Sequence, residues 1–340
     1  MPHPRRIIAK LGRPVIPAAA ATVTAVAAVA LASAQPAAAA AAVTQVKPGT
    51  SLSSVHVQAG HSYAFQRGAT YTGTLNVNRD SVRIGAYGTG QNPVFQRSTA
   101  GNDITVSGNN DFIAHIRLTG KGYQKVPGCG SARTAGYEVG IDVTGSGDQV
   151  YYVRAYGNLY AGVYVETAGD HAVIRHSVFD GVNALNPGNL GAGAFGILLW
   201  GDHNTIDQDT FENQSTCSPD FGTDGSGVEI YHGSFNLIEH STGRADSDFT
   251  ELGGAGATTN TYLDNTFSAP GEFLVTRGSG DTANGPVRNT ILTGNVAHGA
   301  VVSYDWRPGS GTLLTMKDNH VSRLSQDGGF VDKGGNVIGF

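Results

Sequence analysis

The sequence predicts an all-β, single-domain right-handed parallel β-helix, a solenoid with loop insertions on one edge. Short runs rich in Val, Ile and Thr alternate with Gly, Asn and Asp along most of the chain. One such run recurs with a minimal spacing of 22 residues. No segment has the long 3.6-residue apolar period that indicates an amphipathic helix. These observations together favour a repeat architecture built from strands.

The recurring run has the form Gly-apolar-x-apolar-x, and a second run that begins with Asn follows it after a short turn. Copies of the first run occupy 140–144, 162–166, 196–200 and 227–231, with degenerate copies at 249–253 and 272–276. Copies of the second run occupy 204–206, 236–238, 260–262 and 289–291.

Each pair of runs predicts one coil, and coils of this length stack as parallel strands around one continuous core. The 22-residue spacing is seen from Asp142 to Tyr164 and from Glu229 to Glu251. A β-propeller needs about 40 or more residues per blade. The Leu and Asn pattern of leucine-rich repeats is absent from the sequence.

The N-terminal part of the predicted solenoid resembles a known family. Residues 65–75 read Phe-Gln-Arg-Gly-Ala-Thr-Tyr-Thr-Gly-Thr-Leu, and residues 84–90 read Ile-Gly-Ala-Tyr-Gly-Thr-Gly. This stretch, roughly 45–97, resembles the opening coils of secreted bacterial right-handed β-helix proteins of the pectate-lyase-like superfamily. The resemblance implies the fold and a carbohydrate-related role. It implies no single reaction, because the superfamily holds lyases, hydrolases, epimerases and non-enzymatic adhesins.

The first 34 residues have the features of a secretory signal peptide. The cations Arg5, Arg6, Lys10 and Arg13 precede an alanine-rich apolar run that ends in a small-x-small site at 32–34. The cut could fall as late as residue 42, which leaves 43–340 as the β-helix domain. We therefore expect the protein to be secreted and extracellular.

Composition restricts the partners of the mature chain. Without the four cations of the leader it holds 18 basic and 27 acidic residues, a net charge of −9. A negative chain is a poor partner for nucleic acid and for a strongly polyanionic substrate. Nothing after the leader is long and apolar enough to span a bilayer. We expect a monomer that binds a polysaccharide or oligosaccharide.

Three coils are longer than the minimal repeat. The extra residues lie at roughly 119–138, 181–194 and 213–225, each just before a Gly-apolar-x-apolar-x run. They should therefore project from the same edge and form one wall of a groove. Cys129 lies in the first insertion and Cys217 in the third, and a disulfide between them is expected in a secreted protein.

Side chains alternate between the two faces of a strand, so the first run predicts two outward columns of residues. The first column reads Thr105, Asp142, Tyr164, Leu198, Glu229, Glu251 and Leu274. The second column reads Thr144, Glu166, Trp200, Tyr231, Gly253 and Thr276.

Glu229 and Glu251 occupy neighbouring positions of the first column, and we predict them to be catalytic, with Asp248 assisting. Strand spacing places their backbones about 4.8 Å apart. Two stacked carboxylates repel each other, so such a pair tends to share a proton or to bind a cation. A neutral carboxyl beside an ionised one is the arrangement that glycosidases use. Two solvated glutamates that splay apart are the alternative.

Aromatic residues next to this pair predict a sugar-binding surface. Trp200 and Tyr231 are adjacent in the second column and offer flat faces for sugar rings, unless the inserted loops cover them. The full set of predicted substrate-binding residues is Trp200, Tyr231, Tyr164, Asp142, Glu166, His232 and Arg277.

Glycoside hydrolysis without a cofactor is the leading hypothesis. The arrangement resembles that of β-helix glycosidases such as polygalacturonases, but their Asn-Thr-Asp and Arg-Ile-Lys motifs are absent. A polysaccharide lyase is the second hypothesis. There Glu229 and Glu251 would hold Ca²⁺, and Arg277, Arg244 or Arg175 would take a proton from a uronate.

A non-catalytic glycan-binding protein or adhesin is a third hypothesis, and an epimerase is a fourth. Trp200-Gly201-Asp202-His203 is similar to a Trp-x-Asp-His stretch of pectate lyases. However, 169–171 repeats that turn one coil earlier, which indicates turn chemistry instead.

Overall fold

A computed structural model describes the chain from residue 43 onward. The described residues are 43–340 except 98, 123, 135–138, 187, 255, 269–270, 277–286, 305–311, 327 and 340. The predicted signal peptide and its cleavage site lie outside them. Within the described residues no helix has the length and apolar character needed to cross a membrane.

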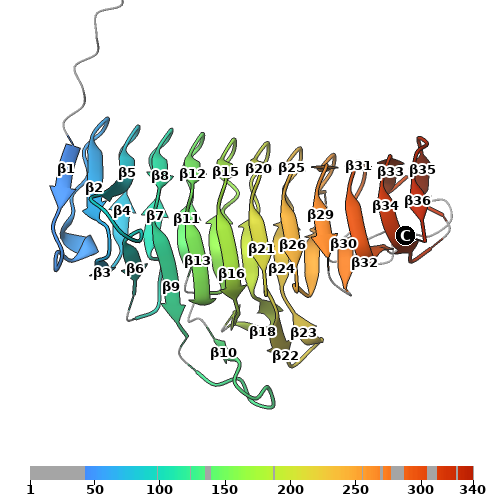
Figure 1. Ribbon diagram of the computed structural model, residues 1–340, viewed down its shortest axis with the longest axis horizontal. Coiled ribbons are helices and arrows are strands. Elements are labelled where there is room, and N and C mark those ends of the chain that lie inside the picture. The colour runs from blue at the N-terminus through green and yellow to red at the C-terminus, as the bar shows by residue number, and fades with distance from the viewer. Residues whose placement is uncertain are drawn as a thin grey trace, which may run out of the picture. The chain divides into compact units, whose positions relative to one another are not determined.

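The chain forms a right-handed parallel β-helix in which most coils contribute three strands (Figure 1). One short 3-10 helix, η1 (Leu52–Ser54), lies among the first coils. The first strand of each coil belongs to a 12-stranded sheet, the first stack. Its strands are β1 (Val43–Val46), β2 (Ser62–Gln66), β5 (Arg83–Tyr87), β8 (Phe112–Ala114), β12 (Gln149–Tyr151), β15 (Val173–Arg175), β20 (Thr205–Asp207), β25 (Leu237–Glu239), β28 (Thr261–Leu263), β31 (Thr290–Thr293), β33 (Leu314–Lys317) and β35 (Phe330–Asp332).

The second and third strands of the coils form two further stacks, which join because β32 and β34 run through both. The second stack holds β3 (Thr70–Thr72), β6 (Val94–Gln96), β9 (Arg117–Lys121), β13 (Arg154–Asn158), β16 (Val178–Val182), β21 (Thr210–Glu212), β26 (Thr242–Arg244), β29 (Thr266–Ser268), β32 (Val296–Tyr304), β34 (His320–Leu324) and β36 (Val337–Ile338). The third stack holds β4 (Leu75–Val77), β7 (Ile104–Val106), β11 (Val139–Val143), β14 (Ala161–Val165), β19 (Phe195–Leu199), β24 (Ser226–Tyr231), β27 (Asp248–Gly253), β30 (Glu272–Thr276) and the later parts of β32 and β34.

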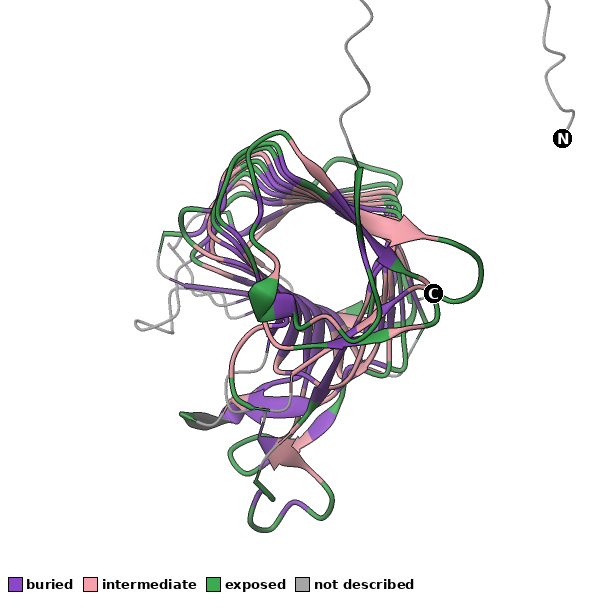
Figure 2. Ribbon diagram, turned by 90° about the vertical axis from the view of Figure 1, so that its left-hand side faces the viewer, coloured by how far each residue is buried: buried purple, intermediate pink, exposed green. Residues whose placement is uncertain are grey.

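One continuous apolar core fills the space between the three stacks. Figure 2, a view along the solenoid, shows the stacked strands that surround this space. Inward Val, Ile and Leu residues repeat from coil to coil, and aromatic rings stack in the same way. Phe179 lies over Phe211 with ring centroids 5.2 Å apart, and Phe249 lies over Phe273 at 5.3 Å. The predicted fold class is confirmed, because parallel coils bury these side chains only when they stay in register.

Buried polar side chains line up where the strands of the first stack begin. The Asn236 backbone N–H donates to Asn260 Oδ1 at 3.0 Å, and the side-chain amide of Asn260 donates to the Gly233 carbonyl at 2.9 Å. Asp111 and Asp148 occupy the equivalent positions in earlier coils. The Asp111 N–H donates to Asp148 Oδ1 at 2.8 Å. The outer carboxyl oxygen Oδ2 of each aspartate has no hydrogen-bond partner among the described residues.

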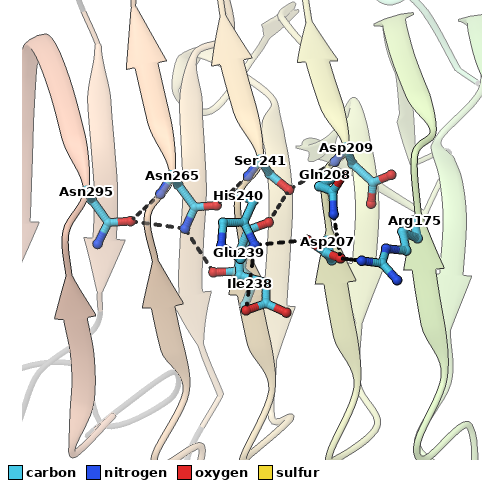
Figure 3. A network of polar contacts seen from close by, with 10 residues as sticks. All are labelled: Arg175, Asp207, Gln208, Asp209, Ile238, Glu239, His240, Ser241, Asn265 and Asn295. Atoms are coloured by element: carbon cyan, nitrogen blue, oxygen red, sulfur yellow. Dashed lines mark hydrogen bonds and ion pairs between the residues drawn. The ribbon is translucent and has the colours of Figure 1, made fainter.

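A similar ladder runs along the start of the second stack (Figure 3). The Ser241 N–H donates to Asn265 Oδ1 at 2.9 Å, and the Asn265 N–H donates to Asn295 Oδ1 at 3.0 Å. Asp209 is the acidic member of this buried ladder, and burial raises its pKa well above the usual value. These ladders satisfy backbone donors at the corners of the coils, where the strand pairing is interrupted.

The three insertions fold together into a lobe beside the third stack, below the coils in Figure 1. Strand β10 (Arg133–Thr134) pairs in parallel with β17 (Ala184–Asn186), and β17 pairs with β18 (Asn189–Gly193). A hairpin of β22 (Thr216–Ser218) and β23 (Gly222–Asp224) completes the lobe. The predicted disulfide between Cys129 and Cys217 is present, with Cα atoms 5.4 Å apart. The prediction that the insertions share one edge is confirmed.

The predicted outward columns need one correction in β30. Strand pairing places Val275, and not Leu274, beside Glu251. Leu274 is fully buried in the core, and Thr276 is buried as well. The phase shifts because Phe273 stacks on Phe249 inside the core, which fixes how β30 aligns with β27. Leu274 and Thr276 therefore do not belong to the outward columns.

The two ladder aspartates predict a pH-dependent stability. Burial raises the pKa of Asp148 to about 7 and that of Asp111 to about 6, from the usual 3.8. The folded chain therefore keeps protons that the unfolded chain releases, so the free energy of unfolding should fall as the pH rises from about 4 to about 7. An amide that donates to a neighbouring carbonyl should stabilise Asp148→Asn by about 1–3 kcal/mol at pH 8.

Urea unfolding at pH 5 and pH 8 measures this effect. The exposed Asp318 supplies a matched control, and Asp318→Asn should leave the difference between the two pH values unchanged. A wild-type protein that is equally stable at both pH values would contradict the prediction.

Removal of the disulfide should lower the stability of the protein. The disulfide closes a loop of 88 residues, and loop-closure entropy for that length corresponds to roughly 4–5 kcal/mol. Replacing both Cys129 and Cys217 with Ala should lower the midpoint of thermal unfolding and expose the lobe to limited proteolysis. Reduction of the wild-type protein should reproduce the effect, whereas equal cleavage rates for the oxidised wild type and the double variant would count against it.

Candidate active site

A groove of about 580 Å³ runs over the outward face of the third stack, beside the lobe. Strands β19, β24, β27 and β30 form its floor, and lobe residues that include Ala192, Phe221 and Asp224 form its wall. Asp224 Oδ2 accepts a hydrogen bond from the Gly193 N–H at 2.9 Å, which ties strand β23 to strand β18. The insertions therefore give one side of an otherwise flat solenoid face a raised edge.

Glu229 and Glu251 lie side by side on the groove floor. They are direct partners in the parallel pairing of β24 and β27, as the 22-residue spacing predicts. Glu229 is only 8% exposed, whereas Glu251 is half-buried. The Ser226 hydroxyl lies 3.4 Å from Glu229 Oε2. Their neighbours in the same column are Leu198 on one side and Val275 on the other.

A second pair of acids lies parallel to the first. Asp248 on β27 pairs in register with Glu272 on β30, and both line the groove. Asp248 is among the site residues predicted from the sequence, whereas Glu272 is not. The equal spacing of 24 residues from Asp248 to Glu272 and from Phe249 to Phe273 was the signal that could have found it. Four carboxyl groups thus lie on three successive strands.

Aromatic side chains occupy the other half of the floor. The Trp200 and Tyr231 rings have centroids 5.5 Å apart and are tilted by 40°. Both residues line the groove and both are half-buried, so the lobe does not cover them. The indole Nε1–H of Trp200 is buried without a hydrogen-bond partner among the described residues.

An apolar cluster outside the main core holds this aromatic floor in place. Leu198, Phe195, Ala161 and Val139 are buried there, and Trp200 packs against them together with three partly buried residues. The outward face of the third stack is therefore covered at this end, where the apolar cluster packs against the lobe. Leu198 is the last covered position, and the face is open as a groove in the coils that follow it. This explains why Leu198, predicted to point outward, is nevertheless only 4% exposed.

The remaining predicted binding residues lie at or beyond the edge of the groove. Tyr164 contacts the Trp200 ring at 6.2 Å between centroids, and the His232 ring lies 5.5 Å from that of Trp200. Asp142 and Glu166 lie on coils nearer the N-terminus and do not line the groove. Arg277 falls outside the described residues. Their proposed roles toward a substrate remain predictions.

Asp142 has an environment of its own. It is buried, and its Oδ2 accepts a hydrogen bond from the Asn102 side-chain amide at 2.7 Å. Burial, reinforced by the charge of Glu166, raises the pKa of Asp142 to about 6. The same burial raises the pKa of Tyr164. Asp142, Tyr164 and Glu166 therefore form a group of interacting side chains on the third stack beside the groove.

The arginines considered as lyase bases need a correction. Arg175 lies on β15 of the first stack and pairs with Asp207 at 2.6 Å. Arg244 lies on β26 of the second stack and pairs with Glu212. Neither stack contributes to the groove floor, so neither guanidinium reaches the acids on the third stack. Among the described residues that line the groove there is no Lys or Arg.

Two places offer donors for a metal ion. In the groove, the four carboxyl groups supply the oxygen donors that Ca²⁺ prefers. On the first stack, donor atoms of Asp207, Glu239 and His240 lie within 4.8 Å of one another (Figure 3). There His240 Nδ1 lies 3.1 Å from Asp207 Oδ1, and the Arg175 guanidinium occupies the other oxygen. The second cluster already has its cation, which makes it an ion-pair network between coils.

The pectate-lyase-like turn at Trp200 is structural, as the sequence indicated. The Asp202 N–H donates to Asp170 Oδ1 at 2.8 Å, and the Ser234 N–H donates to Asp202 Oδ1 at 2.7 Å. His171 and His203 then stack with centroids 5.1 Å apart. These residues repeat from coil to coil on a turn and do not line the groove.

Comparison with solved structures shows the same fold at low sequence identity. Pectate lyase Pel9A is 16% identical and superposes with a TM-score of 0.61, covering 86% of this chain and 79% of that one. An alginate lyase from Paenibacillus sp. str. FPU-7 is 14% identical, with a TM-score of 0.51 and coverages of 87% and 97%. No protein-family model and no curated protein matches the sequence.

Phage tailspike proteins also share the fold. The tailspike protein of an E. coli bacteriophage, solved in complex with a pentasaccharide, is 13% identical with a TM-score of 0.53. The match covers 83% of this chain and about 60% of that protein. The superpositions establish the right-handed parallel β-helix. At such low sequence identity they do not establish the chemistry, which must be argued from the residues of this chain.

Proposed function

We propose that this protein is a glycoside hydrolase that cleaves an extracellular polysaccharide lying in the groove beside the lobe. The observation that carries the proposal is the register of Glu229 and Glu251, which places two carboxyl groups on adjacent strands at the floor of that groove. Tyr231 lies on β24 with Glu229, and Trp200 directly follows β19, the preceding strand of the stack. Tailspike, pectate lyase and alginate lyase structures with the same fold support a glycan as the ligand.

The two glutamates differ in a way that suits the two roles of a glycosidase. Glu229 is nearly buried beside Leu198 at the floor of the groove, and we assign it the role of proton donor. It would donate a proton to the glycosidic oxygen as the bond to the anomeric carbon breaks. Glu251, which is more exposed, would either attack that carbon or take a proton from the attacking water. Asp248 and Glu272 would keep this part of the groove negative.

The charge of the groove limits the substrate. Asp224, Glu229, Asp248, Glu251 and Glu272 all line it, and the described lining residues include no cation. Acidic residues gathered in the groove of a chain with an excess of acids favour a substrate that is not strongly polyanionic, and carboxylates there would stabilise the positive charge that develops on the sugar ring during hydrolysis. We therefore favour a neutral or amino-sugar polymer. The predicted leader and the disulfide support action outside the cell.

A polysaccharide lyase is the second candidate, and the two lyase structures with this fold favour it. In that case the groove acids would hold Ca²⁺ against a uronate. The reaction also needs a base near the sugar. Arg175 and Arg244 lie on other stacks, so of the three predicted bases this candidate depends on Arg277, which lies outside the described residues. A product that absorbs ultraviolet light and disappears with chelator would favour the lyase over the hydrolase.

Substitution of the paired glutamates tests the hydrolase. Glu229→Gln and Glu251→Gln should each lower kcat/KM by roughly 100-fold or more, because each removes an acid–base group while keeping its shape. New reducing ends, measured over a panel of neutral, amino and uronate polysaccharides, give the activity. Glu212→Gln, on the second stack, is the matched control and should keep full activity. Full activity in both groove variants would end the proposal.

The role of the aromatic side chains in oligosaccharide binding can be tested separately. Trp200→Ala should weaken oligosaccharide affinity by about tenfold, because it removes a stacking surface and the unpaired indole donor. Affinity electrophoresis in gels that contain the substrate polysaccharide measures this loss. Phe235→Ala removes an aromatic side chain that is 50% exposed on a turn outside the groove and should change nothing. Equal retention of the two variants would remove Trp200 from the binding surface.

A further inference from the structure

A second pocket, of about 390 Å³, lies at the corner between the first and second stacks near the N-terminal end. Arg67, Arg117 and Arg154 line it together with Gln91 and Asn92. It shares no lining residue with the acidic groove. In a chain with an excess of acids, three guanidinium groups therefore converge on one shallow site, and no acidic residue is part of its lining.

Strand pairing forces two of these cations together. Arg117 begins β9 and Arg154 begins β13, and the two residues are direct partners in the parallel pairing. Adjacent strands lie about 4.8 Å apart, so the two charges are stacked on neighbouring coils. Like charges in this position destabilise a sheet unless something compensates them.

Contacts within the protein hold these arginines but neutralise only one of them. Arg117 Nη1 donates to Gln91 Oε1 at 2.7 Å, and its Cζ lies 5.0 Å from the Tyr156 ring centroid. Arg67 donates to Asn92 Oδ1. Arg154 pairs with Asp180 at 2.5 Å. Arg67 and Arg117 form no ion pair with any residue that the structure describes.

The positive charge of Arg67 affects the pKa of the neighbouring His115. His115 lies on the turn that leads into β9, and its pKa is lowered, first by burial and then by the charge of Arg67. Neutral amides, Gln91 and Asn92, orient two of the guanidinium groups and leave their charge free to act on a ligand. Each guanidinium carries five N–H donors in a planar fork, so donors remain beyond those that these contacts use.

We propose that this pocket binds an oxyanion carried by a saccharide: a sulfate, phosphate or carboxylate group held between the paired arginines. An oxyanion there would remove the repulsion between Arg117 and Arg154 and accept charge-assisted, bidentate hydrogen bonds. The arginines carry the oxyanion part of this proposal, and that a saccharide bears the group rests on the glycan ligand of the proposed function and not on the hydrolytic reaction. The acidic groove would repel such a group, so a polymer with charged and neutral segments would contact the two sites with different parts.

Binding of dextran sulfate to the purified protein, measured by isothermal titration calorimetry at 50 mM salt, tests the proposal, with unmodified dextran as the uncharged reference. Arg117→Gln and Arg154→Gln should each weaken binding by about tenfold or more, because each loses charge-assisted hydrogen bonds. Arg79→Gln removes an exposed arginine that does not line the pocket and should stay within twofold of wild type. Arg154 is itself exposed, so its variant remains informative even if Arg117→Gln fails to fold.

Inorganic sulfate, inorganic phosphate and polygalacturonate identify the source of the oxyanion. The site is upheld if sulfate, phosphate or polygalacturonate competes with dextran sulfate and this competition requires Arg117 and Arg154. The strengths of competition then rank the ligands. Undiminished dextran sulfate binding by both pocket variants would overturn the proposal. So would an equal loss in Arg79→Gln, because binding would then follow net charge alone. Glu229→Gln should bind as wild type does, which separates this result from the test of the hydrolase.

Discussion

In-register pairing between successive coils is the constraint on which the rest of this structure depends. Each strand of a stack contributes its backbone hydrogen bonds to the coil before and the coil after. A side chain at one position is therefore fixed about 4.8 Å from its equivalent in the next coil. Interior positions use this repetition to stack Phe on Phe and Asn on Asn. On the exterior the same repetition stacks Glu229 on Glu251 and Arg154 on Arg117. A fold that stabilises like residues inside therefore gathers like charges outside, where a substrate or ligand can compensate them.

The polar ladders show what that constraint costs where it is imperfectly met. Asparagine suits the corner positions because its oxygen accepts from one coil while its amide donates to a carbonyl of another. Aspartate at the same positions keeps the acceptor and lacks the donor, so Asp111 and Asp148 gain by holding a proton. The raised pKa values in these ladders belong to the scaffold. The groove acids, by contrast, lie on the outward face of the third stack and line a groove that a ligand can enter.

The lobe turns a regular solenoid into one with a single defined groove. Without it, the outward face of the third stack would be equally open along its length. The disulfide between Cys129 and Cys217 joins the first insertion to the third, and the second insertion supplies the strands between them. The apolar cluster that Ala192 of the lobe packs against covers the floor up to Leu198, and beyond it Trp200, Tyr231 and Glu251 are partly exposed in the groove. The candidate site therefore begins where the insertions end, and its position depends on residues far from the acids in sequence.

The sequence by itself determined the solenoid, the 22-residue register of Glu229 with Glu251, the common edge of the insertions and the cysteine pair. The first three follow from local spacing, because strand alternation and repeat length act on consecutive residues. The cysteine pair follows from two cysteines in a chain with a predicted secretory leader. Only the tertiary structure decided the phase of β30, where Phe273 and Leu274 offer two equally apolar alignments and stacking of Phe273 on Phe249 selects one. That choice brought Glu272 beside Asp248 and buried Leu274 and Thr276. The tertiary structure also placed Arg175 and Arg244 on stacks away from the groove and brought Arg67 to Arg117 and Arg154. Which face of the solenoid a residue occupies depends on how the whole coil turns, and no short sequence window records that.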